Sequence, residues 1–167
     1  SAPQPTVQIV GETTLCEGET VTLTASASDT YMWSNNATTQ SITVSAAGTY
    51  NVTTTNADAC NGVGQSDDVS IVVTPQPTAT VGAPSINGTI VTFTNSSSDA
   101  TSYSWDFGDF STSSATAPTH AYAANGSYTV TLTAINGNCS DDTTFTVNIT
   151  VGLEELSIAN NVIVFPN

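Results

Sequence analysis

The chain has 167 residues and contains neither Lys nor Arg, so its 14 Asp and Glu side chains leave a formal net charge of −14. Without cationic side chains it cannot neutralise phosphates, which excludes ordinary nucleic-acid binding and attraction to an anionic membrane surface. Thr and Val are abundant, and no apolar run reaches the ~18 residues of a membrane-spanning helix, so the composition favours strands and turns.

The first half of the chain predicts a series of short strands. Residues 21–25 alternate apolar side chains with Thr, and a Tyr-x-Trp sequence follows at 31–33. A Gly-x-Tyr-x-Val sequence occupies residues 48–52, and a last apolar run covers residues 69–73. Period-two alternation with turn residues between short runs is typical of an antiparallel β-sandwich.

The second half repeats the same order. An alternating run covers residues 91–95, Tyr-x-Trp returns at 103–105, and Gly-x-Tyr-x-Val returns at 126–130. An offset of about 72 residues is the signature of an internal repeat. We therefore predict an all-β chain of two tandem immunoglobulin-like β-sandwiches, the first at residues 7–74 and the second at residues 79–151.

A short Pro-rich sequence precedes each predicted domain. Pro-Gln-Pro-Thr occupies residues 3–6 and again residues 75–78. Two Pro in four residues make a short, semi-rigid spacer, so we assign residues 75–78 as the linker between the domains. By the same pattern, we expect residues 1–6 to be a linker that follows a further domain outside this sequence.

Two aromatic positions recur in each predicted domain. Trp33 and Trp105 lie where a central strand is expected, and we interpret both as buried core anchors with one partner for the indole N–H. Tyr50 and Tyr128 open the next strand, where a Tyr hydroxyl can fix the corner of a sandwich.

The second half also carries a specific family resemblance. Residues 103–109 (Tyr-Ser-Trp-Asp-Phe-Gly-Asp), 118–122 (Pro-Thr-His-Ala-Tyr) and 126–133 (Gly-Ser-Tyr-Thr-Val-Thr-Leu-Thr) resemble the polycystic kidney disease (PKD) domain family over about residues 78–151. Phe110 departs from the family, which usually has Gly after Asp-Phe-Gly-Asp. The resemblance implies a structural role for this motif.

Two weaker resemblances concern the rest of the chain. The first half, with Cys-Glu-Gly-Glu at 16–19 and Tyr-Met-Trp-Ser-Asn at 31–35, is similar to immunoglobulin-like repeats of Bacteroidetes surface proteins. Residues 152–167 look like the start of the carboxy-terminal sorting domain of type IX secretion substrates; the alternative is an extra strand after a Gly hinge. These resemblances imply a location on the bacterial cell surface or secretion.

The sequence lacks the residues of a catalytic site. His120 is the only His, which rules out sites with two imidazoles, and we expect it to be packed or hydrogen-bonded. The chain has no Lys for a Schiff base and no Arg for an oxyanion. We therefore predict that it is not an enzyme and needs no cofactor.

Calcium is the one ligand that the Asp residues could bind. Asp106 with Asp109 and Asp141 with Asp142 are weak candidates, and the Asp pair at 67–68 is another. The PKD resemblance is consistent with calcium, because some members of the family bind it. Against the idea, neighbouring Asp residues in a strand point to opposite faces of the sheet.

Three Cys in such a chain suggest an oxidising environment, and an odd number leaves one without a partner inside it. Cys16 precedes the second strand of the first sandwich and Cys60 follows the sixth, so a Cys16–Cys60 bond would join opposite ends, ~20 Å apart. A disulfide needs Cα atoms within about 7 Å. In a head-to-tail array Cys16 instead faces Cys139 of the next domain. We therefore predict an interdomain Cys16–Cys139 disulfide, with Cys16–Cys60 as the alternative and Cys60 left for a missing upstream domain.

These features favour a non-catalytic extracellular stalk or spacer in a multidomain adhesin or secreted surface protein. The alternatives are a carbohydrate- or protein-binding module, ancillary domains of a secreted hydrolase, and a self-assembling filament subunit whose tail adds as a strand to a neighbour. The expected partners are neighbouring domains of the same longer chain, and further candidates are the secretion machinery or identical subunits.

Overall fold

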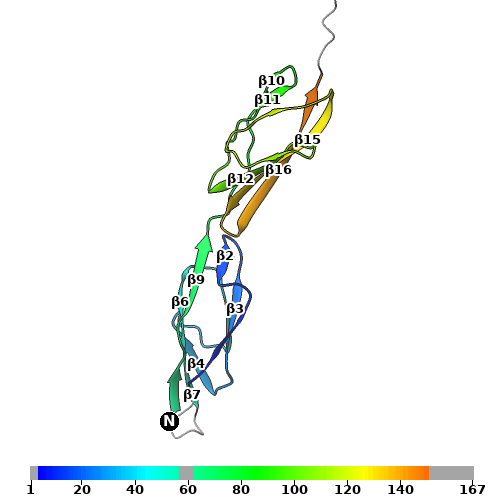
Figure 1. The fold of residues 1–167 in the computed structure, drawn as a ribbon. Helices are drawn as coiled ribbons and strands as arrows, with labels where there is room; N and C mark the ends of the chain where they lie inside the picture. Colours follow the sequence, from blue (N-terminus) through cyan, green and yellow to red (C-terminus); the bar gives the residue numbers. More distant parts are fainter. Residues whose placement is uncertain (1–3, 57–61, 151–167) are drawn as a thin grey trace, which may run out of the picture.

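The structure is a computed structural model that describes residues 4–56 and 62–150. These residues form sixteen β-strands in two domains placed end to end, which gives an elongated molecule (Figure 1). The prediction of an all-β chain with β-sandwich domains is confirmed. No helix in the described part is long and apolar enough to cross a membrane.

The first domain is a sandwich of two layers. One layer is an antiparallel sheet in the order β1-β3-β5, and the other combines the orders β4-β7-β8 and β2-β9-β6. Only Asn51 separates β6 from β7, so these two strands run on as one, and β2 pairs with β9 in parallel. The strands are β1 (Val7–Val10), β2 (Thr14–Cys16), β3 (Val21–Ala25), β4 (Thr30–Trp33), β5 (Ser41–Val44), β6 (Gly48–Tyr50), β7 (Val52–Asn56), β8 (Gly62–Gln65) and β9 (Val69–Thr74).

The core of the first domain is aliphatic around one indole. Along β3, Val21, Leu23 and Ala25 are buried, while the Thr side chains between them face outward. The outward Thr24 hydroxyl forms a hydrogen bond of 2.9 Å with Ser41 on β5, which ties the polar face of the layer together.

The second domain pairs a small sheet with a larger one. The small sheet has the order β10-β11-β14, and the larger has the order β13-β12-β15-β16. The strands are β10 (Ser85–Asn87), β11 (Ile90–Thr92), β12 (Ser102–Asp106), β13 (Thr112–Ser113), β14 (Thr119–Ala121), β15 (Gly126–Asn136) and β16 (Cys139–Ile149). Its core is rich in aromatic rings, with Phe93 packed against both Trp105 and Phe107 at centroid distances of 5.3 Å.

The hairpin of β15 and β16 reaches from the far end of the second domain to the first domain (Figure 1). Its two 11-residue strands pair without interruption from Gly126 opposite Ile149 to Asn136 opposite Cys139. The two-residue loop begins with Gly137 at φ +60°, a conformation that Gly adopts without steric cost and that suits a tight hairpin. The hairpin tip therefore carries Cys139 to the boundary between the domains.

Candidate functional site

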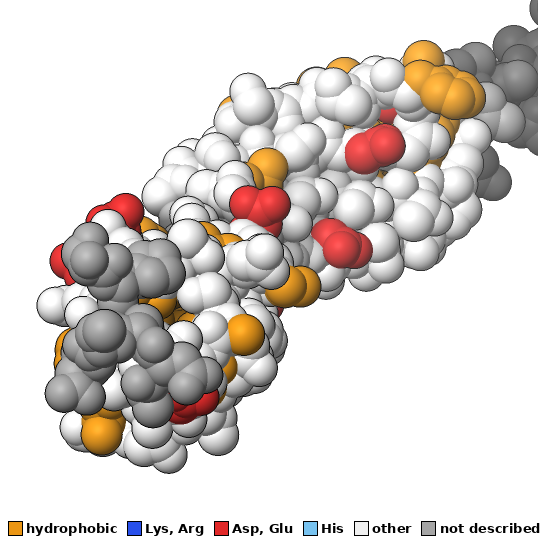
Figure 2. All heavy atoms as spheres, turned by 90° about the horizontal axis from the view of Figure 1, so that it is seen from below, with side chains coloured by type: hydrophobic (Ala, Val, Ile, Leu, Met, Phe, Trp, Pro, Cys, Tyr) orange, Lys and Arg blue, Asp and Glu red, His pale blue; other side chains and the backbone are white. Residues whose placement is uncertain are grey.

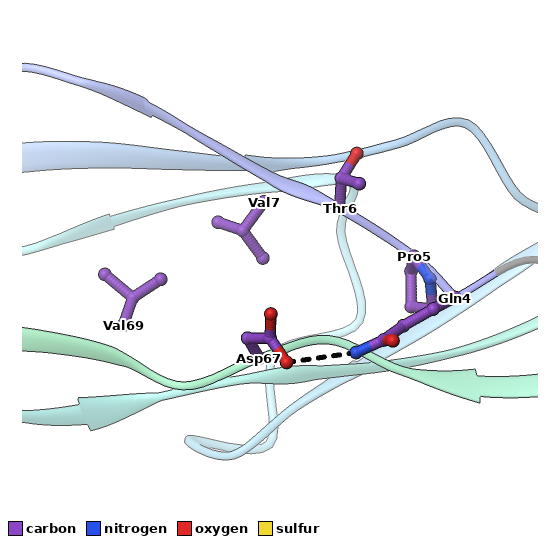
Figure 3. Close-up of a pocket in the computed structure, with 6 residues that line it drawn as sticks. All are labelled: Gln4, Pro5, Thr6, Val7, Asp67 and Val69. Carbon is purple, nitrogen blue, oxygen red and sulfur yellow. Dashed lines mark hydrogen bonds between the residues drawn. The ribbon is translucent and has the colours of Figure 1, made fainter.

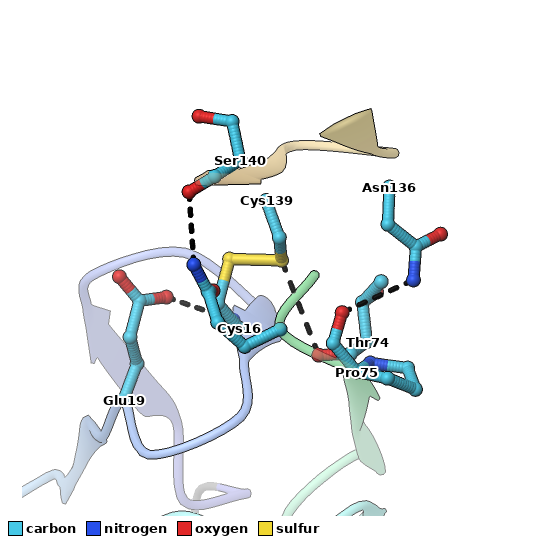
Figure 4. The surroundings of a disulfide bond; sticks show 8 residues. Cys16, Glu19, Thr74, Pro75, Asn136, Cys139 and Ser140 are labelled. Carbon is cyan, nitrogen blue, oxygen red and sulfur yellow. Dashed lines mark hydrogen bonds between the residues drawn. A yellow bond between two sulfur atoms is a disulfide. The ribbon is translucent and has the colours of Figure 1, made fainter. Parts of the chain in front are cut away.

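The joint between the two domains holds the clearest chemical feature of the molecule. Cys16 and Cys139 form a disulfide with a Cα–Cα distance of 5.6 Å across 123 positions of sequence (Figure 4). This is the pair that strand topology predicts in preference to Cys16 with Cys60. Cys60 itself lies outside the described residues, as does the tail at 152–167.

Local backbone geometry places Cys16 at the joint. Parallel pairing of β2 with β9 sets Cys16 beside Thr74, the last residue of the first domain's final strand. A turn then follows, in which the Glu19 N–H donates to the Cys16 carbonyl at 2.9 Å and Gly18 has φ +92°. The Glu19 carboxylate in turn accepts the Cys16 N–H at 2.8 Å, which holds the turn closed (Figure 4).

Two hydrogen bonds hold the linker against the hairpin of the second domain. Asn136 Nδ2 donates to the Pro75 carbonyl at 3.0 Å (Figure 4), and Gln76 Nε2 donates to the Ser140 carbonyl at 2.8 Å. Pro77, the next linker residue, is fully buried. Sequence reasoning missed these bonds, although the repeated Pro-Gln-Pro was a signal that the linker is more than a spacer.

The four predicted core and corner residues occupy matching places in the two domains. Trp33 and Trp105 are at most 1% exposed, and their indole N–H groups donate to backbone carbonyls at 2.8 and 3.0 Å. The half-buried Tyr50 and Tyr128 each donate the hydroxyl to the carbonyl four residues earlier, at 3.1 and 3.0 Å. Each domain thus has one indole anchor and one Tyr corner.

The Asp-Phe-Gly-Asp segment of the second domain is a tightly capped loop. Asp106 Oδ1 accepts the Gly108 N–H at 2.9 Å, and Asp109 Oδ1 accepts the Ser111 N–H at 3.1 Å. Gly108 has φ +78°, and a Cβ at this position would lie 2.4 Å from the Thr129 carbonyl oxygen. No other residue fits there, so the motif has a structural reason in this chain.

His120 is packed and hydrogen-bonded. Its Nε2 lies 2.7 Å from Asp109 Oδ2, and its ring stacks on Phe107 at a centroid distance of 4.2 Å. Burial by itself raises the pKa of Asp109, but the hydrogen bonds from His120 and Ser111 outweigh it and hold that pKa below its usual value. The pair links the loop after β12 to β14 and stabilises the ionised carboxylate.

Tyr122 completes this aromatic group. It is 2% exposed, and its hydroxyl donates to the Phe107 carbonyl at 3.1 Å. Burial, with the nearby Asp109 charge, raises the pKa of Tyr122 to about 12 because the phenolate would be poorly solvated there. Tyr122 is therefore a neutral, packed core residue, and the ionised carboxylate of this group is Asp109.

The Asp residues considered for calcium are held apart in separate contacts. Asp141 accepts the Ala79 N–H at 2.8 Å on the linker side of β16, whereas Asp142 is exposed on the opposite face. Asp67 and Asp68 each accept from a different side-chain amide, at 3.1 and 2.7 Å. Across residues 4–56 and 62–150, no three His, Cys, Asp or Glu side chains gather as a metal site would require.

Surface hollows are open, and both polar and apolar groups line them. One lies at the amino-terminal end of the first domain, holds about 310 Å³, and is crossed by the hydrogen bond from Gln4 Nε2 to Asp67 Oδ1 (Figure 3). Its lining residues are Gln4, Pro5, Thr6, Val7, Asp67 and Val69. Figure 2 shows acidic side chains scattered among uncharged polar ones on one face, without a concentrated charged patch.

Comparisons with known proteins identify the family of the second domain. A family model described as the PKD domain matches residues 72–151. The PKD1 domain of Vibrio anguillarum Epp is 34% identical, with 46% of this chain and 96% of that one covered and a TM-score of 0.43. The chain belongs to the PKD family through its second domain. The PKD1 domain of the Vibrio cholerae metalloprotease PrtV is 38% identical, with coverage of 44% and 96% and a TM-score of 0.41.

A further solved structure concerns the fold alone. Murine CEACAM1b is 14% identical, with 88% of this chain and 99% of that one covered and a TM-score of 0.50. A search of the curated proteins finds no match. PKD and related immunoglobulin-like domains are generally non-catalytic modules of extracellular multidomain proteins, and the disulfide is consistent with that setting.

Proposed function

We propose that the chain is a non-catalytic stalk segment of a bacterial adhesin or secreted surface protein, and that it holds a more distal part at a fixed distance. The joint is the observation that carries this proposal. Domains connected only by a linker usually move relative to each other. Here a disulfide bonds the first domain to the second, and the Asn136 and Gln76 hydrogen bonds hold the linker against the second domain.

The surface supports a spacer over a binding module. Within residues 4–56 and 62–150 the aromatic side chains are buried or half-buried, with Phe110 as the exception. His120, the one imidazole, is held against Asp109 and Phe107. A clustered aromatic face, which would favour a carbohydrate-binding module, is missing from this part of the chain.

The proposed partners follow from the same assignment. They are neighbouring domains of the same longer chain, which the second copy of Pro-Gln-Pro-Thr at residues 3–6 supports. Residues 152–167 keep their resemblance to a type IX sorting domain, for which the partner is the secretion machinery; addition of this tail to an identical subunit is the rival role. Expression of the parent protein with and without these residues, followed by surface labelling, separates the two roles.

The stalk proposal is testable through the rigidity of the joint. We expect residual dipolar couplings from both domains of the oxidised chain to fit one alignment tensor. In a Cys16→Ser/Cys139→Ser variant the two domains should need separate tensors, because the remaining Asn136 and Gln76 hydrogen bonds join the linker to the second domain only. A Cys60→Ser variant, which keeps the joint disulfide, is the matched control. Two independent tensors in the oxidised chain would contradict a rigid stalk.

One observation favours a binding module as the second candidate. Phe110 is fully exposed at φ +68°, and a bulky residue held in this conformation is a recognised mark of functional sites. A glycan and protein-ligand screen that compares the chain with Phe110→Gly tests this role. Binding lost in the variant, with the fold intact, would favour it over a passive spacer.

A further inference from the structure

The Cys16–Cys139 bond divides the chain in an unequal way. The two cysteines are 123 positions apart, so nearly all of both domains, residues 17–138, lies inside one covalent loop. Outside the loop, the structure describes only residues 4–16 on the amino-terminal side and 139–150 on the carboxy-terminal side. The two ends of the molecule are thus connected by a covalent route that passes through neither the linker nor most of the strands.

This short route runs along the length of the molecule. Residues 4–16 carry β1 and then β2 from the amino-terminal end of the first domain to the joint (Figure 1). The disulfide crosses the joint, and β16 continues from Cys139 to the far end of the second domain (Figure 1). The three parts therefore lie in series between the two ends.

We propose that the disulfide is a tension bypass, which passes a pulling force along residues 4–16, across Cys16–Cys139 and along β16, while the rest of both domains stays unloaded. The bypass rests on the proposed stalk function, because a stalk that holds a distal adhesive part is pulled from its two ends. A partner bound at either end would load this route first, since it is the shortest covalent connection.

The geometry makes the bypass nearly inextensible. The route has about 25 residues, and fully extended chain reaches ~3.3–3.6 Å per residue. A β-strand already rises ~3.3 Å per residue, so straightening this route can add at most about 20 Å. Without the bond, tension would pass through β9 and the linker, and each domain of about 70 residues could unravel by about 200 Å.

A purely stabilising disulfide makes a different prediction. Such a bond would raise the force at which a domain unfolds, but the length released on unfolding would stay at about 200 Å per domain. The bypass instead removes that length, whatever the force. Released length, more than force, therefore separates the two roles.

Single-molecule force spectroscopy of the full chain, with handles fused at both ends, is the direct test. All proteins carry Cys60→Ser, so that only the joint pair can form, and residues 151–167 add the same length to each. We expect the oxidised chain to release less than about 20 Å before the handles fail. The Cys16→Ser/Cys139→Ser variant should release two steps of about 200 Å each.

The oxidised chain decides the question even if the serine variant fails to fold. One step of about 200 Å from disulfide-bonded protein, with the bond verified by mass spectrometry, would overturn the bypass. Reduction of the same oxidised molecules in place is the second comparison and should restore both steps. The rigidity of the joint is measured separately, by dipolar couplings, so the stalk and the bypass can fail independently.

Discussion

The two domains share a frame but differ in how continuous their strands are. In both, a Trp donates to a backbone carbonyl and a Tyr fixes a corner. In the first domain the last two strands are broken, between β6 and β7 at Asn51 and between β8 and β9 at residues 66–68. In the second domain the corresponding β15 and β16 run for 11 residues each.

That difference creates the joint. After the break, β9 pairs in parallel with β2. This pairing brings Cys16 to the end of the first domain, opposite Thr74. The unbroken hairpin of the second domain extends far enough to present Cys139 there. The disulfide therefore depends on the strand breaks of the first domain and on the unbroken hairpin of the second. The Trp and Tyr residues that the two domains share do not place the cysteines.

The largest expected effect comes from removing one indole anchor at a time. Trp33→Ala and Trp105→Ala should each destabilise their own domain by about 3–5 kcal/mol, because a large buried side chain leaves a cavity. Each variant keeps a single Trp, whose fluorescence reports the other domain, while circular dichroism reports both. Separate transitions are expected, and coincident ones would show that the joint couples the domains into one folding unit.

Gly108→Ala should come next, at a loss of about 2–3 kcal/mol from the second domain. The added Cβ would lie 2.4 Å from the Thr129 carbonyl oxygen, and φ +78° is unfavourable for Ala. Gly18→Ala in the first domain is the matched control, because φ is +92° but nothing lies within 4 Å of the new Cβ. It should cost about 1 kcal/mol. Equal losses in thermal melts would rule out the steric explanation.

Sequence patterns predict the elements of each domain better than the contacts between distant residues. Alternation in β3 and the repeated Trp and Tyr are local signals, and they identify strands and core positions. The direction of the strands, taken with a head-to-tail arrangement of the domains, also predicts Cys139 as the partner of Cys16.

Other features depend on three-dimensional placement that no local pattern encodes. The Asp109–His120 contact joins the loop after β12 to β14, and the Asp141 carboxylate accepts the N–H of Ala79, just after the linker. From the sequence alone these Asp residues look like possible calcium ligands, because spacing shows clustered carboxylates but does not show which N–H groups they accept. The break between β8 and β9 cannot be read from the local sequence either. At the break, Ser66 Oγ accepts the Val52 N–H, a contact between residues far apart in the sequence.

Alkaline pH should weaken the second domain selectively. The unfolded chain loses the Tyr122 proton near the ordinary pKa of about 10, whereas the folded domain keeps it until about 12. The contribution of Tyr122 to the free energy of unfolding is therefore fully present below about pH 10. It falls by up to about 3 kcal/mol as the pH rises to about 12.

Denaturant titrations at pH 8 and pH 11 measure this loss. Tyr122→Phe has no proton to lose at this position, so its second domain should show a smaller drop between the two pH values, although it lacks the hydrogen bond to Phe107 at both. An identical drop in the variant would assign the alkaline sensitivity to other groups.

The smallest expected effect is a gain in stability, and it compares one turn in each domain. The backbone N–H of Trp33 donates to the carbonyl of Ala37, and the backbone N–H of Phe107 donates to the carbonyl of Ser111. In each case the acceptor lies four residues later in the sequence. The fourth residue of each turn has positive φ, +67° at Asn36 and +68° at Phe110. Asn tolerates this conformation, but a bulky aromatic residue does not.

Phe110→Gly should therefore stabilise the second domain by about 0.5–1 kcal/mol, because the relief of backbone strain exceeds the added entropy of the unfolded chain. The exposed ring makes no buried contact whose loss would offset the gain. Asn36→Gly should change the first domain by only a few tenths of a kcal/mol, since Asn is already at ease there. Thermal melts that detect each domain check both values. A destabilised Phe110→Gly variant would mean that the ring makes a contact which its full exposure does not suggest, and the case for Phe110 as a residue kept for binding would then fall with it.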